Sequence, residues 1–285
     1  MAALPGALPG ALRGTLRRTL RGRAALGIPL VALFALAAVL GPMLAPYPPR
    51  AIDLARELAG PSRAHLLGTA DNGVDVLSVL LSGARLAGEV SVASVAVSLV
   101  VGVLLGGGAA WAGAWVEPLV ARVTDAAQAF PALVLNLAVL ALVARAGVIH
   151  LVVALSVTGW VAYARIARAE VLRLRDREFV TAARALGATP ARVFFRHVLP
   201  NAAGPLVVQA TFGLGTAVLA EASLSFLGLG PGAEASWGAL LDQGTAHLLR
   251  APRIAMVAGA AISATVLGFN LTGDWLRDRL DPRDD

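Results

Sequence analysis

The sequence contains no cysteine and no lysine. Without cysteine the chain can form no disulfide, no thiolate nucleophile and no cysteine-ligated metal site. Without lysine it lacks the side chain that a P-loop places on the β- and γ-phosphates of ATP, and the amine that a Schiff-base enzyme needs. If the protein uses ATP through a P-loop, a different subunit must therefore supply that loop.

Charged residues are also scarce. They make up 15% of the 285 residues, against 57% hydrophobic residues, and the mean hydropathy is +0.73. These values are far from a soluble domain, where about a quarter of residues are charged. The formal net charge of +6 could suggest nucleic acid, but the arginines flank apolar runs, which is the usual mark of membrane topology. We expect an integral membrane protein in contact with lipid and without a nucleic-acid partner.

Catalytic patterns are missing. The four histidines, His65, His150, His197 and His247, are far apart in the sequence, and there is no HExxH or GxSxG motif. We therefore expect no catalytic residue, no metal site and no enzymatic activity in this chain.

Uncharged runs of about 20 residues can cross the roughly 30 Å hydrocarbon core as helices. The sequence predicts an all-α polytopic membrane protein with six transmembrane helices, at residues 26–45, 87–110, 118–143, 147–166, 203–226 and 253–275. Arginine placement predicts their orientation, because cytoplasmic loops are enriched in Arg. Both termini and the loop 167–202 are expected in the cytoplasm.

This topology divides the chain into consecutive parts. We expect a cytoplasmic tail at 1–25, a first transmembrane helix at 26–45, an extracytoplasmic segment at 46–86, a five-helix core at 87–275 and a cytoplasmic tail at 276–285. Basic residues before an apolar core also fit a cleaved signal peptide, although no small-x-small cleavage site follows. Residues 74–85 are amphipathic at helical spacing, which predicts a helix in the outer membrane interface, or a soluble cap packed on the bundle.

Few polar groups fall inside the predicted spans. Asn136 and Gln209 lie in mid-span and are candidates either for hydrogen bonds between helices or for lining a transport pathway. Glu221 lies near the end of its span, where an interfacial partner is expected. No acidic residue falls at a membrane midplane, and Gly102 and Gly106 form a GxxxG pattern that suits close helix packing.

The loop 167–202 has a pattern of its own. Residues 172–187 predict one helix, with Phe179, Ala182, Ala183 and Leu186 on a single face. Gly187 is expected to end this helix in the left-handed conformation. A purely physical interpretation leaves two possibilities open, namely a folded connector or a helical ligand for the groove of a cytoplasmic subunit.

A second short helix should follow. Thr189 is a good N-cap and Pro190 a good first residue. The helix would carry Val193, Phe194 and Val198 and end at Leu199, before Pro200.

The loop resembles the EAA motif of ATP-binding-cassette importer permeases. Its spacing is matched by Ala182, Ala183, Gly187, Leu199 and Pro200, whereas Thr181 stands in place of the motif Glu and His197 in place of an aliphatic residue. Residues 65–85, 122–135, 219–230, 236–241 and 269–283 are also similar to C-type permeases of dipeptide, oligopeptide and nickel importers. Ala70 and Val74 depart from that family, which usually has Asp and Arg there.

The resemblance implies a type I (MetI-like) permease of a bacterial plasma membrane, forming half of the pathway for a peptide-like or nickel-type solute. It implies pairing with a second homologous permease, two cytoplasmic ATPase subunits that bind ATP and Mg, and an extracytoplasmic solute-binding protein, with no cofactor bound by this chain. The residues expected to couple the chain to the ATPase are Thr181, Ala182, Ala183, Arg184, Gly187, Val193, Phe194, Leu199 and Pro200. Thr181 cannot form the ion pair that the motif Glu could form.

Two alternatives belong to other classes of protein. A self-contained, proton-coupled secondary transporter would be expected to carry a midplane acid and an inverted repeat, and neither is visible. A membrane scaffold would carry out no transport, and its complex would not stimulate ATP hydrolysis.

Overall fold

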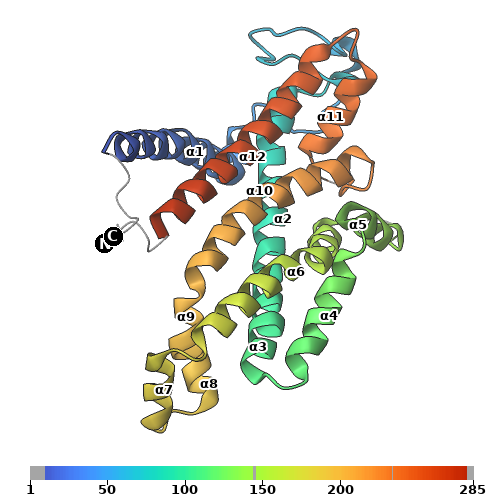
Figure 1. Ribbon diagram of the computed structural model, residues 1–285. Coiled ribbons are helices and arrows are strands. Elements are labelled where there is room, and N and C mark those ends of the chain that lie inside the picture. Colours follow the sequence, from blue (N-terminus) through green and yellow to red (C-terminus); the bar gives the residue numbers. More distant parts are fainter. Residues whose placement is uncertain (1–9, 144–145, 233, 281–285) are drawn as a thin grey trace.

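The computed structural model describes residues 10–143, 146–232 and 234–280. Within these ranges every regular element is a helix. There is no strand, and the one β-type pairing is an isolated bridge between Thr69 and Asp75. The helices form an elongated bundle, as Figure 1 shows. The predicted all-α fold is therefore confirmed.

Five helical segments of the described chain are long and apolar enough to cross a membrane. A sixth span is possible if a bent pair of helices, α4 and α5, counts as one. The segments are Ala24–Leu44 within α1 (Gly10–Leu44), Val76–Ala112, Val148–Leu174 (α6), Ala203–Phe226 (α10), Pro252–Leu280 (α12), and the pair Val116–Gln128 (α4) and Ala132–Ala141 (α5).

The third predicted span is not one helix. α4 and α5 are bent by 83° relative to each other across residues 129–131. Pro131 precedes α5 with an extended ψ of 124°, and proline has no N–H to continue the ladder of helical hydrogen bonds. The prediction of one helix over 118–143 is therefore wrong, because the chain bends at the break that ends in Pro131.

The second span begins earlier than predicted. α2 (Val76–Gly102) continues through the π-helical turn η3 (Val103–Gly107) into α3 (Gly108–Ala112). The amphipathic helix expected at 74–85 is present from Val76 onward, but it is the first part of α2 and not a separate element. The backbone of Gly83 lies against Trp237, and a Cβ at Gly83 would come within 2.7 Å of that ring.

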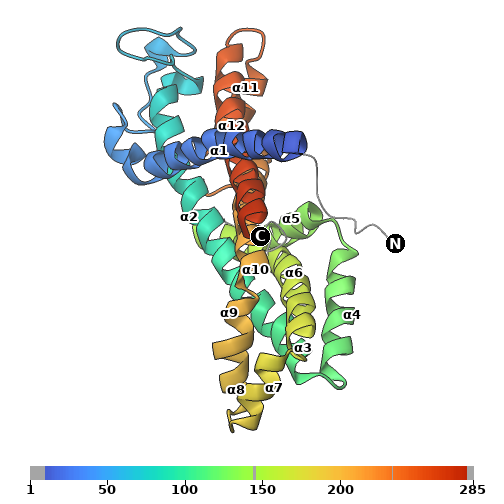
Figure 2. The ribbon, with the colours of Figure 1, turned by 60° about the vertical axis from the view of Figure 1, so that its left-hand side comes forward.

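The apolar core joins helices that are distant in the sequence. Phe34 of α1 packs edge-on against Trp237 and Phe269, with ring centroids 5.9 and 5.7 Å apart. α2 packs on α6, and α12 packs on α1, α10 and α11 (Trp237–Ala246). Figure 2 shows α1 running across α12.

The two ends of the bundle differ. The segment 45–75, which includes the short turns η1 (Leu54–Arg56) and η2 (Asp71–Gly73), lies with α11 at one end. The hairpin of α7 (Glu178–Ala185) and α8 (Pro190–Val193) lies at the opposite end in both views.

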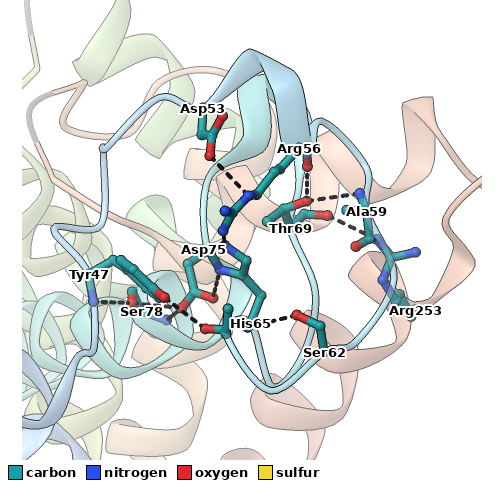
Figure 3. A network of polar contacts seen from close by, with 11 residues as sticks. Tyr47, Asp53, Arg56, Ala59, Ser62, His65, Thr69, Asp75, Ser78 and Arg253 are labelled. Atoms are coloured by element: carbon teal, nitrogen blue, oxygen red, sulfur yellow. Dashed lines mark hydrogen bonds and ion pairs between the residues drawn. The ribbon is translucent and has the colours of Figure 1, made fainter.

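A buried polar network holds segment 45–75 against the start of α2, as Figure 3 shows. Asp75 accepts hydrogen bonds from the backbone N–H of Ser78 (2.8 Å) and from its hydroxyl (2.7 Å), and so caps α2. The Nδ1 atom of His65 lies 2.9 Å from Asp75, and Arg56 Nη1 lies 3.2 Å from His65 Nε2. Because a guanidinium can only donate, Nε2 accepts and Nδ1 carries the proton directed at Asp75.

A second contact joins this segment to α12. Nη2 of Arg253 donates to the carbonyl oxygens of Leu58 (3.0 Å), Ala59 (2.7 Å) and Thr69 (3.0 Å). Ala70 is fully buried and Val74 packs beside it in a cluster with residues of α2, α11 and α12. At the two positions where the chain departs from the resembled family, apolar packing therefore replaces the charged groups.

Candidate functional site

The α7–α8 hairpin follows a break that the sequence did not predict. α6 ends at Leu174 and α7 begins only at Glu178, so the helix predicted over 172–187 is wrong. Arg175 lies in the break and donates a hydrogen bond from Nη1 to the carbonyl oxygen of Ala110 (3.2 Å). The break lets α7 turn back so that Val180 is buried against the end of α3 and α6.

The bend between the two helices is set by Gly187. Its φ of +80° lies in the left-handed region, which glycine adopts without steric cost. No atom lies within 4 Å of the position that a Cβ would occupy. The predicted left-handed conformation is confirmed, and the backbone angle alone, not crowding, requires glycine here.

The start of α8 also follows the prediction. The hydroxyl of Thr189 accepts a hydrogen bond from the N–H of Arg192 (3.4 Å), and Pro190 occupies the first turn. The predicted end at Leu199 is wrong, because a π-helical turn, η4 (Phe194–Val198), leads into α9 (Leu199–Asn201). Pro200 has no N–H to donate to the preceding helical turn. The π-turn shifts the hydrogen-bond register, so the chain stays helical through Pro200.

One face of the hairpin packs on the bundle. Val180, Val193 and Val198 are fully buried and Phe194 is 5% exposed, in a cluster with Ala110 of α3. The guanidinium of Arg184 lies 4.9 Å from the ring centroid of Trp111, within the range of a cation–π interaction. These contacts fix the hairpin to the ends of α3 and α6.

The opposite face is open and apolar. Leu186 is 88% exposed and Phe179 is 39% exposed. Thr181, Ala182, Gly187 and Pro200 are also exposed, whereas Ala183 and Leu199 are half-buried. Leu186 belongs to the apolar face that the spacing predicted, but it was not among the predicted contact residues. Its helical spacing with Phe179, Ala182 and Ala183 is the sequence signal that could have identified it.

Several arginines lie in α6, in the hairpin and in the turn that follows it. Arg173 pairs with Glu170 (2.6 Å), Arg175 with Asp176 (3.6 Å), and Arg168 with Glu117 of α4. Arg177, Arg192 and Arg196 are exposed, and none of the ion pairs found in the described chain involves them. The hairpin and the turn after it therefore carry exposed apolar side chains together with three exposed arginines, Arg177, Arg192 and Arg196, here called the cationic rim.

A cavity of about 560 Å³ opens between α2, α5, α6 and α10. Asn136 and Gln209, the two predicted mid-span polar residues, both line it. Asn136 is 3% exposed, and its Oδ1 accepts a hydrogen bond from the hydroxyl of Thr158 (3.1 Å). Both roles considered for Asn136 thus meet at one position, since it joins α5 to α6 and faces the cavity.

Two glycines allow α6 to pack closely against α2 and the turn η3 that continues it. A Cβ at Gly102 would lie 2.6 Å from the carbonyl oxygen of Trp160, and one at Gly106 would lie 2.1 Å from that of Ala164. Such contacts leave no room for a side chain. The GxxxG pattern therefore marks close helix packing, as predicted.

Glu221 is buried inside the bundle. It is 1% exposed, and its Oε1 accepts hydrogen bonds from the hydroxyls of Ser225 (2.7 Å) and Ser236 (3.0 Å). The sequence did not predict this burial, which arises because the chain after α10 folds back and places Ser236, the N-cap of α11, against the carboxyl group. Glu221 thus joins α10 to α11.

Comparison with known proteins gives a consistent result. Residues 98–284 match the family model described as "Binding-protein-dependent transport system inner membrane component". The matched part contains the α7–α8 hairpin and most of the residues that line the cavity.

Two curated relatives resemble nearly the whole chain. The dipeptide transport system permease protein DppC of Alkalihalophilus pseudofirmus is 36% identical over 261 residues, which is 91% of this chain and 86% of the relative. The oligopeptide transport system permease protein OppC of Bacillus subtilis is 35% identical over 261 residues, covering 91% of this chain and 85% of the relative.

Proposed function

Because the chain belongs to the family of binding-protein-dependent transport system inner membrane components, we propose that it forms half of the translocation pathway of an ATP-binding-cassette importer for short peptides. The peptide assignment is supported by the names of its relatives, which are dipeptide and oligopeptide permeases. A nickel-type solute is less well supported, since neither name mentions a metal.

The orientation proposed from the arginine distribution places both termini and the α7–α8 hairpin in the cytoplasm. Segment 45–75 then faces the outside, at the other end of the bundle. A solute-binding protein delivers peptide to that outer end. A second homologous permease subunit, proposed to be a separate chain, completes the pathway, and two ATPase subunits bind ATP and Mg on the cytoplasmic side.

The observation that carries this proposal is the open face of the hairpin. Leu186 is 88% exposed; it follows Ala182 by one helical turn and precedes Gly187, and a methyl group and a glycine leave room for close approach. The inner face is anchored through Val193 and Phe194. A rigid element with one anchored face and one open apolar face is suited to fill a groove of a partner.

The cationic rim adds to this fit. Arg192 would meet a groove with acidic edges, because complementary charge steers association, whereas Arg184 would hold the hairpin in place through its contact with Trp111. Closure of the ATPase dimer on ATP would then move the hairpin and, through α6 and α10, the walls of the cavity. Asn136 and Gln209 would line the pathway that this movement opens and closes.

The test is the substitution Gly187→Val in the complete importer, reconstituted in proteoliposomes. Valine disfavours a φ of +80°, at a cost of about 1–3 kcal/mol. We expect ATP hydrolysis to be uncoupled from peptide uptake while the protein stays in the membrane. Gly187→Asn is the matched control, because asparagine tolerates the left-handed conformation and adds a side chain at the same exposed position.

Peptide uptake at the wild-type level in the Gly187→Val importer would contradict the role proposed for the hairpin. Uptake that survives ATP depletion and stops with an uncoupler would instead support a proton-coupled secondary transporter. Neither outcome depends on knowing which peptide is preferred.

A further inference from the structure

One hydroxyl in the wall of the cavity has no partner within the described chain. Tyr163 of α6 lines the cavity and is 3% exposed, and its Oη atom is buried without a hydrogen bond. The hydroxyl lies against α10, where a Cβ at Gly213 would come within 2.2 Å of it. An unpaired buried hydroxyl is unfavourable, and nearly all buried polar groups in folded proteins are paired.

The cavity that Tyr163 lines also contains other neutral hydrogen-bonding side chains. Asn136 uses its Oδ1 as acceptor for Thr158, which leaves its amide N–H groups available as donors. Gln209 lies one helical turn before Gly213 on α10, and it also lines the cavity. Tyrosine hydroxyl and carboxamide groups together form a set of donors that suits carbonyl oxygens.

No charged side chain is among the residues that line the cavity in the described chain. One lining residue, Gln128, accepts a hydrogen bond from Arg165, which does not itself line the cavity. A carboxylate or ammonium group would therefore find no opposite charge on these walls, and unpaired charges are costly to bury. The cavity is suited to neutral amides.

We propose that the Tyr163 hydroxyl donates a hydrogen bond to a backbone carbonyl oxygen of the peptide in transit, and that Asn136 and Gln209 contribute further neutral contacts. This inference rests on the proposed function. The site then recognises the backbone that all peptides share, and it does not discriminate between acidic and basic side chains. The group that recognises the peptide backbone is the hydroxyl of Tyr163, whereas its ring packs against the helices.

Two measurements on Tyr163→Phe separate this role from a structural one. The substitution removes only the hydroxyl, which forms no bond within the described chain, so the melting temperature of the importer should stay the same or rise. Uptake at saturating peptide should fall by between about twofold and about tenfold, as expected for one lost hydrogen bond. A structural role would lower the melting temperature instead.

The experiment uses the complete importer with its binding protein in proteoliposomes, and it follows ATP-driven uptake of trialanine, Ala-Glu-Ala and Ala-Lys-Ala. Tyr47→Phe is the matched control, because the sequence has two tyrosines and Tyr47 lies in segment 45–75, where its hydroxyl donates to the carbonyl oxygen of Ala64 (3.0 Å). We expect Tyr163→Phe to reduce uptake of all three peptides by the same factor, and Tyr47→Phe to leave uptake per folded complex unchanged.

Three outcomes would overturn the inference while leaving the proposed function intact. These are wild-type uptake rates in Tyr163→Phe, a melting temperature that falls together with uptake, and reduction factors that differ between the acidic and the basic peptide. A wild-type importer without ATP-driven uptake of any of the three peptides would overturn both the inference and the proposed function.

Discussion

Replacing Leu186 by alanine should weaken binding of the ATPase without destabilising the permease. The side chain is 88% exposed, so it makes few contacts that the substitution could remove within the chain. If an ATPase groove buries it, truncation removes about three carbon atoms from that contact, at about 0.8 kcal/mol each. The expected loss of about 2 kcal/mol corresponds to a dissociation constant about 30 times higher.

The assay is a titration of ATPase subunits against the permease pair in lipid nanodiscs, combined with a thermal melt of the permease alone. Val180→Ala serves as the contrasting variant, because Val180 is fully buried on the inner face of the same helix. It should lower permease stability by about 1–3 kcal/mol through the cavity that it leaves. Leu249→Ala is the exposed control at the other end of the bundle, since Leu249 is 100% exposed.

Binding of the ATPase to Leu186→Ala as tightly as to the wild type would refute a contact between Leu186 and the ATPase. That contact is equally refuted if Leu249→Ala weakens binding as much as Leu186→Ala does, because the effect would then not belong to the hairpin. A fall in the melting temperature of Leu186→Ala would show that the side chain supports the permease fold and not a partner.

Two further predictions concern the stability of the permease, one through helix packing and one through buried hydrogen bonds. Gly106→Ala should lower the melting temperature of the permease, because its Cβ would lie 2.1 Å from the carbonyl oxygen of Ala164, whereas Gly108→Ala, with no atom within 4 Å, should not. Asp75→Ala should destabilise the protein by about 2–4 kcal/mol in chemical denaturation, since it removes a helix cap and other buried hydrogen bonds. Asp53→Ala, which removes only an exposed ion pair, should change the stability by less than about 1 kcal/mol.

Local sequence rules predicted the parts of the hairpin that depend on single residues. Gly187 takes its left-handed conformation and Thr189 caps α8 because each effect operates within a few residues of the chain. The exposed or buried face of α7 could not be predicted in the same way. Periodicity grouped Phe179 with Leu186, but it did not show that Val180 would be the residue in contact with α3.

Features that depend on distant contacts were not predicted. The sequence did not predict that residues 76–85 continue into α2, nor that Gly83 would contact Trp237, 154 residues further along the chain. The burial of Glu221 likewise depends on Ser236, which lies beyond the end of α10. Tyr163 was not singled out, because only the assembled cavity shows that its hydroxyl has no partner.

The cavity shows what the positions of polar residues within the predicted spans could establish. Asn136 and Gln209 were recognised as unusual because polar side chains are expensive inside a membrane, and the structure brings both to one cavity. Their shared location could not be derived from their positions in the sequence, because the relative rotation of α5 and α10 depends on packing.

The central claim is that the α7–α8 hairpin contacts the ATPase, and the absence of cysteine from the chain allows a direct measurement. A single substitution, Leu186→Cys, gives a unique site for a short thiol-to-amine cross-linker in the assembled importer. We predict a cross-linked product that contains this chain and an ATPase subunit, and no such product with Leu249→Cys. Absence of the product with Leu186→Cys, in a complex that still hydrolyses ATP, would contradict the account.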